Sequence, residues 1–173
     1  MFPILLGLAF TCAAPAQQSI PKAEGTTLEG TAVTLPEALR GRAGVLVVGF
    51  SHASEAQVAA WGKRLAADFA QSADVPYFEV PMLAGAPKML RGMIVKSMGK
   101  SVPEAERPHF LPLTKDEAAW RAVAHYDKPD DAYVLLVDGT GAVRWQTEGE
   151  GSDAAYEELK KNLKSLTAQP GTP

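Results

Sequence analysis

Ser51, His52 and Ser54 are the residues of this sequence best suited to chemistry, and they directly follow an apolar run. A histidine beside serines has the residue types of a nucleophile and its general base. Such a pair also needs an acid to orient the histidine. The nearby candidate, Glu55, is the neighbour of Ser54 in a predicted helix, which is a poor position for that role. We therefore favour a surface histidine, and an enzyme that uses His52 and the two serines is the alternative.

Thiol and metal chemistry have little support in the available residues. Cys12 is the single cysteine of the chain, and it lies in a segment that we expect to be removed. The mature chain is then cysteine-free, so thiol oxidoreductase or peroxidase activity is not expected. The three histidines, His52, His109 and His125, are far apart in sequence and form no H-x-x-x-H pair. The sequence therefore predicts no metal site and no cofactor.

The elements that position these residues are predicted to alternate between strand and helix. The continuous apolar run at 44–50 is typical of a central strand covered on both faces. A helix should follow, because Ser54 and Gln57 have the spacing of a capping box. Further strands are predicted at 75–80, 132–138 and 142–147, helices at 115–125 and after Ser152, and a short hairpin at 27–35. This order predicts an α/β fold with a central mixed sheet and helices on both faces.

The lead-in at 35–42, Leu-Pro-Glu-Ala-Leu-Arg-Gly-Arg, resembles the approach of redoxin domains to their first central strand. The order of elements is also similar to that of this thioredoxin-like superfamily. Its members carry a C-x-x-C pair at the start of the next helix, where this chain has residues near Ser54 and Gln57. The resemblance thus implies a vestigial active-site loop without redox chemistry, made of Ser51, His52, Ser54 and Gln57.

Three stretches carry a closer resemblance. They are 35–51 with Trp61 on the following helix, 96–104 before an aromatic piece at 109–111, and 131–138 leading to 143–145. The last stretch looks like the "Y-V-Y-L-V-D…I-R-W" pattern of the thioredoxin-like assembly factors of the ATP synthase membrane sector, best known from mitochondria. The resemblance covers roughly residues 26–165. It implies a role in helping a membrane-protein subunit to fold or assemble.

The segment 88–100 is predicted to be an inserted helix that is basic and rich in methionine. Apolar residues should gather on one side and basic residues on the other, with no acidic residue between them: Met89, Leu90, Met93, Ile94 and Met98 against Lys88, Arg91, Lys96 and Lys100. Such a helix suits an anionic membrane surface or a partner helix. The alternative is a helix whose apolar face packs on the sheet and whose basic side is solvated. Gly92 and Gly99 weaken the helix in either case.

The N-terminus has the pattern of an export signal over residues 1–16. Its apolar run ends before Ala14-Pro15-Ala16, an A-x-A cleavage pattern, although no Lys or Arg precedes the run. A buried N-terminal strand is the alternative, and lipid attachment at Cys12 is disfavoured. We expect a flexible leader at 17–26, the thioredoxin-like domain at 27–167 and a disordered tail at 168–173. The protein should be exported, either periplasmic or secreted, with membrane association left open.

The bulk composition narrows the function classes. The chain of 173 residues has a net charge of −3, which argues against a nucleic-acid binder, and no apolar stretch is long enough for a transmembrane helix. Our hypothesis is a non-redox, chaperone-like assembly factor that contacts a membrane-protein client or a membrane surface. Its contact face would combine the basic methionine helix with the vestigial loop. The alternatives are the enzyme at His52 and a secreted domain that binds a soluble partner.

Overall fold

The computed structural model describes residues 18–168. A four-stranded sheet forms the centre, with the order β4-β3-β5-β6. Its strands are β3 (Gly44–Gly49), β4 (Tyr77–Pro81), β5 (Ala132–Val137) and β6 (Val143–Glu148). β3 pairs in parallel with β4 and antiparallel with β5, and β5 and β6 form an antiparallel hairpin. The predicted α/β class with a mixed central sheet is therefore confirmed.

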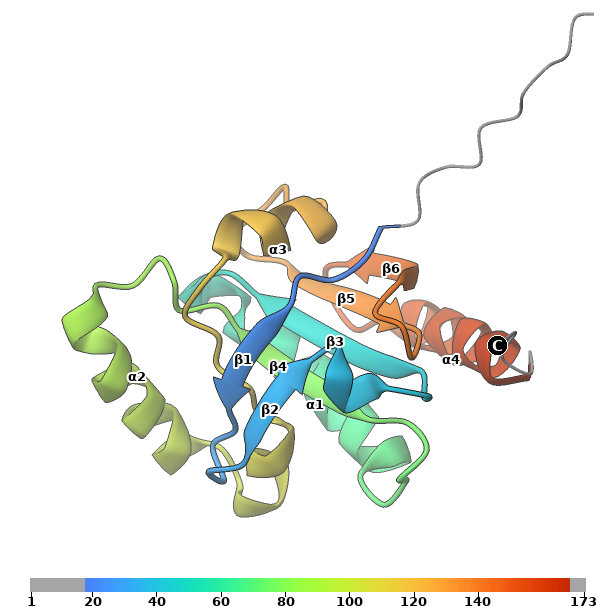
Figure 1. Cartoon of the computed structure of the whole chain (residues 1–173), viewed down its shortest axis with the longest axis horizontal. Coiled ribbons are helices and arrows are strands. Elements are labelled where there is room, and N and C mark those ends of the chain that lie inside the picture. Colours follow the sequence, from blue (N-terminus) through green and yellow to red (C-terminus); the bar gives the residue numbers. More distant parts are fainter. Residues whose placement is uncertain (1–17, 169–173) are drawn as a thin grey trace, which may run out of the picture.

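The two central strands, β3 and β5, are buried at every position. Their continuous apolar sequences allow this, because a strand covered on both faces has no solvent-facing side that needs polar residues. On one face lie α1 (Glu55–Phe69) and α4 (Asp153–Ala168), which contribute Trp61, Leu65 and Leu159 to a buried cluster. On the other face, Trp120 of α3 (Glu117–Val123) packs over the strands. Helices thus cover both faces, as predicted (Figure 1).

The start of the domain differs from the prediction. The predicted flexible leader at 17–26 packs on the domain in its described part, residues 18–26. Ile20 is buried, Ser19 forms a β-bridge with Ala142, and β1 (Ala23–Thr26) pairs with β2 (Ala32–Leu35). The hairpin therefore begins earlier than the predicted 27–35. The local sequence could not predict this packing, because Ser19 and Ile20 contact residues that are far away in the sequence.

Two predicted helix starts also differ. Ser54 makes no side-chain cap at α1, so the predicted capping box with Gln57 is wrong. The helix predicted at 115–125 is shorter, Glu117–Val123, and begins after Asp116 in a left-handed conformation. The cap predicted at Ser152 is present, since its hydroxyl accepts the Ala155 N–H at 3.2 Å. The predicted signal at 1–16 and nearly all of the predicted tail at 168–173 lie outside the described residues.

An inserted helix, α2 (Lys88–Ser101), stands apart from the sheet between β4 and the 3-10 helix η3 (Glu104–His109). Figure 1 shows α2 at the left edge of the molecule, on the opposite side from α4. The structure describes α2 throughout, and none of its residues is buried. The interpretation in which its apolar face packs on the sheet is therefore wrong. None of the described helices is both long and apolar enough to cross a membrane.

Candidate functional site

The serine hydroxyl groups in the loop between β3 and α1 form hydrogen bonds to backbone groups. The Ser51 hydroxyl donates to the Pro129 carbonyl at 2.6 Å and accepts the Ala53 N–H at 3.0 Å. The Ser54 hydroxyl is buried and donates to the Ser51 carbonyl at 2.9 Å. Both hydroxyls thus already have partners, and no hydrogen bond links either one to an imidazole in residues 18–168.

The His52 side chain is exposed to solvent. Its side chain is 96% exposed and pairs with Glu55 at 2.7 Å, which is one turn further along the chain. An imidazole in this position has no hydroxyl to deprotonate, so the residues predicted as a nucleophile and base lie near one another without forming that pair. The geometry favours the surface-histidine interpretation.

Gln57 has a different function from the predicted cap. Its side-chain carbonyl accepts the Ala132 N–H at 3.0 Å, and its amide donates to Asp131 at 3.4 Å. It therefore ties the first turn of α1 to the start of β5. One end of this contact is thus at Gln57, near the position where redoxin domains carry the C-x-x-C pair.

A cavity of about 540 Å³ opens beside this loop. Its walls come from the start of α1, the end of β4, the inner side of α2 and the segment that runs through η3. Ile94 and Met98 of α2 line it together with Ser51, His52 and Ser54. The structure thus brings part of the vestigial loop and part of the predicted helix to one site. Volume and lining fall in the range of a ligand or peptide pocket.

Glu79 is a functional candidate that the sequence analysis missed. It lies on β4, its side chain is 3% exposed, and it lines the cavity. Burial, with a smaller contribution from the charge of Glu106, raises the pKa of its carboxyl group to about 8. No side-chain hydrogen bond or ion pair to this carboxylate occurs in residues 18–168. One signal was present in the sequence: a single acidic residue interrupts the otherwise apolar strand 75–80.

The other side of α2 presents an unusual surface to solvent. Met89 is 88% exposed and Met93 67%, although large apolar side chains are commonly covered. Lys88, Lys96 and Lys100 are exposed on the same helix. The predicted separation into an apolar and a basic side is therefore only partial. Ile94 and Met98 face the cavity, whereas the remaining apolar residues share the exposed surface with the lysines; we call this surface, of Lys88, Met89, Leu90, Met93, Lys96 and Lys100, the outer face of α2.

Arg91 does not belong to the outer face. Its guanidinium group donates to the carbonyl oxygens of Ala86 at 2.9 Å, Thr114 at 3.1 Å and Ala84. These bonds fix the start of α2 to the segments before it and before α3. Arg91, predicted on the basic side of this helix, therefore anchors it to the neighbouring segments.

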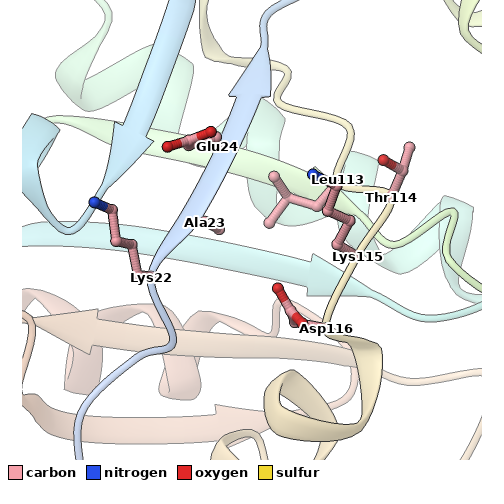
Figure 2. A pocket seen from close by; sticks show the side chains of 7 residues that line it. All are labelled: Lys22, Ala23, Glu24, Leu113, Thr114, Lys115 and Asp116. Atoms are coloured by element: carbon pink, nitrogen blue, oxygen red, sulfur yellow. The ribbon is translucent and has the colours of Figure 1, made fainter.

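Two other kinds of site, a metal centre and a second pocket, have less support in the described part of the chain. Among residues 18–168, no group of three His, Cys, Asp or Glu side chains could hold a metal ion. A smaller pocket of about 200 Å³ lies between β1 and the segment before α3. Figure 2 shows Lys22 and Glu24 on one side of β1 and Leu113, Thr114 and Lys115 on the other. Its polar groups therefore do not converge on a common point.

Solved structures of thioredoxin-like proteins resemble this chain over most of its length. An uncharacterized conserved protein from Geobacillus kaustophilus matches with a TM-score of 0.64 at 16% identity, covering 92% of this chain and 85% of that one. BsSco, a member of the Sco family of cytochrome c oxidase assembly proteins, matches with a TM-score of 0.59 at 16% identity, and the match covers 91% of this chain and 98% of BsSco. A putative thiol:disulfide interchange protein DsbE from Chlorobium tepidum also has a TM-score of 0.59 at 16% identity, with 87% of this chain and 96% of that one covered. The fold is thus thioredoxin-like, as the sequence resemblance implied.

The family is shown by sequence. A profile of the family described as ATP10 protein matches residues 14–166. This chain belongs to the ATP10 protein family, a family linked to ATP synthase assembly. The closer of the two resemblances is therefore confirmed. No curated protein sequence gave a significant match.

Proposed function

We propose that this chain is a non-redox assembly factor that holds a membrane-protein client of the ATP synthase membrane sector through the outer face of α2. The observation that carries the proposal is the exposure of Met89 and Met93 among lysines, on a helix without a single buried residue. Flexible methionine side chains adapt to helices of different shape. The lysines suit a client or a bilayer surface with negative charge.

The vestigial loop supports a binding function rather than redox catalysis. The described residues contain no cysteine, and the loop hydroxyls are engaged in internal hydrogen bonds. The loop instead lines the same cavity as Ile94 and Met98 on the inner side of α2. The cavity and the outer face thus lie on two sides of one helix, and a client that wraps around α2 would contact both. We place the protein outside the cytoplasm, in agreement with the export signal predicted at 1–16.

Affinity purification of the tagged protein from gently solubilised native membranes tests this function. We expect ATP synthase membrane-sector subunits to co-purify with the wild type. The variant Lys88→Glu/Lys96→Glu/Lys100→Glu should lose them. The matched control, Lys161→Glu/Lys164→Glu, reverses two exposed lysines of α4 and should retain them. Recovery of the protein alone from the soluble fraction would contradict the proposal and favour a domain that binds a soluble partner.

A further inference from the structure

Glu79 is a buried acidic residue between α1 and the cavity. It faces Gly62 of α1, and a Cβ atom at that position would collide with the carboxylate oxygens. Glu79 also forms part of the lining of the cavity. Buried carboxyl groups in proteins are normally paired or hydrogen-bonded. Glu79 is 3% exposed, borders the cavity and has no hydrogen bond or ion pair from another side chain within residues 18–168, so a ligand in the cavity could supply its partner.

The charges around the cavity indicate what that ligand carries. Glu55 from the start of α1 and Glu106 from η3 line the cavity with Glu79, and no Lys or Arg does. His52 also lines the cavity. Tyr77, two residues before Glu79 on β4, is a titratable neighbour outside the lining. The remaining walls are mostly apolar, with Val58, Met82, Ile94, Met98 and Phe110 among them. A cavity lined by acidic and apolar side chains is complementary to a ligand that joins a cationic group to an apolar part.

We infer that the cavity binds an apolar segment of the client that carries one lysine or arginine, whose cation pairs with the Glu79 carboxylate. This inference rests on the proposed function, because it takes the occupant to be part of the client. A volume of about 540 Å³ accommodates a few side chains rather than a whole domain. The outer face of α2 would hold the body of the client, while its inner side, Ile94 and Met98, covers the inserted segment.

The pairing couples binding to proton release. In the empty cavity the raised pKa of Glu79, about 8, keeps its carboxyl group protonated at neutral pH. An entering ammonium or guanidinium group favours the carboxylate, so the proton leaves Glu79 and passes to solvent. Binding should then become tighter as the pH rises from 6 to 8. Glu55, Glu106 and His52 line the same cavity, and Tyr77 lies close enough to interact with the charge of Glu79, so the pH effect is assigned to Glu79 by comparison with a Glu79 variant.

The test uses two synthetic peptides of alanine and leucine, one with a central lysine and one with glutamine in its place. Fluorescence anisotropy measures their binding to the full chain. For the wild type at pH 8 we expect the lysine peptide to bind about tenfold more tightly than the glutamine peptide. Glu79→Gln should abolish that preference and its pH dependence. Glu157→Gln, a change at an exposed residue of α4, should preserve both.

Equal binding of the two peptides to the wild type would overturn the inference, as would a lysine preference that persists in Glu79→Gln. Co-purification of ATP synthase subunits separates this failure from failure of the proposed function. If the subunits are recovered with the wild type while the peptides are not distinguished, the function stands and the cavity assignment is wrong. If the lysine preference is present and no subunit is recovered, the cavity site stands and its occupant is not that client.

Discussion

Gly62 of α1 lies directly over the carboxylate of Glu79 on β4, with no space between them for a side chain at position 62. This contact explains how a carboxyl group can lie beneath a helix that otherwise packs on the sheet through Trp61, Val58 and Leu65. The missing Cβ of Gly62 leaves room for the carboxylate, and Glu79 also borders the cavity.

Replacing Gly62 by alanine should therefore behave unlike an ordinary helix substitution. Glycine to alanine in a helix interior normally stabilises by roughly 0.5–1 kcal/mol. Here we expect a net loss of about 1 kcal/mol in the free energy of unfolding, because the carboxylate must move. Urea unfolding of the wild type and the variant measures this difference in free energy. In the Glu79→Ala background the same substitution should become stabilising, and a stabilisation of equal size in both backgrounds would refute the contact.

The raised pKa of Glu79 predicts how stability depends on pH. The pKa is 4.5 without perturbation and about 8 in the folded chain, so folding takes up a proton between these values. The contribution of Glu79 to the free energy of unfolding is thus fully present below about pH 4.5 and is lost as the pH rises through 8. We expect Glu79→Gln to gain up to about 3 kcal/mol over the wild type between pH 5.5 and 8.5. Urea unfolding at the two pH values measures this, and parallel pH profiles for wild type and variant would contradict it.

The sequence was informative where structure depends on local pattern. The runs at 44–50 and 132–138 became the buried strands β3 and β5, because a continuous apolar run has few other stable placements. The chain order and the family motifs led to the thioredoxin-like fold. The methionine-rich segment was predicted as a helix, and it is one.

The sequence could not show features that depend on distant residues. Gln57 has the spacing of a cap, yet it bonds to Ala132, which only the packing of α1 against β5 brings near. The carboxyl group of Glu79 fits beneath α1 because residue 62 is a glycine, and only the packing of α1 on the sheet places Gly62 against it. Arg91 looks like one basic residue among four, and its three backbone carbonyl partners become visible only in the folded chain.

Arg91 is expected to hold the first turn of α2 in place. Arg91→Lys should weaken this anchor, because a compact ammonium group cannot reach three carbonyl oxygens in the fork geometry of guanidinium. We expect the protection of α2 amides against hydrogen exchange to fall by roughly 10- to 30-fold, which corresponds to about 1.5–2 kcal/mol. Lys96→Ala, at an exposed position of the same helix, is the control and should change protection little. Equal protection in the two variants would argue against the anchor.

Gln57 should contribute to stability through the link between α1 and β5. Gln57→Ala removes the acceptor of the Ala132 N–H, and we expect a loss of about 1–2 kcal/mol in thermal or urea unfolding. Glu55→Gln breaks only the exposed pair with His52 in the same turn and should cost less than about 0.5 kcal/mol. Similar losses for the two variants would mean that Gln57 does not tie the elements together.

Site-specific photo-cross-linking in native membranes probes the proposed contact between the outer face of α2 and its client. A photoreactive residue replaces Met93 in one variant and Lys161 of α4 in the other, both at exposed positions. We predict that the variant at position 93 forms an adduct with a subunit of the ATP synthase membrane sector and that the variant at position 161 does not. No such adduct from position 93, or the same adduct from both positions, would contradict the account.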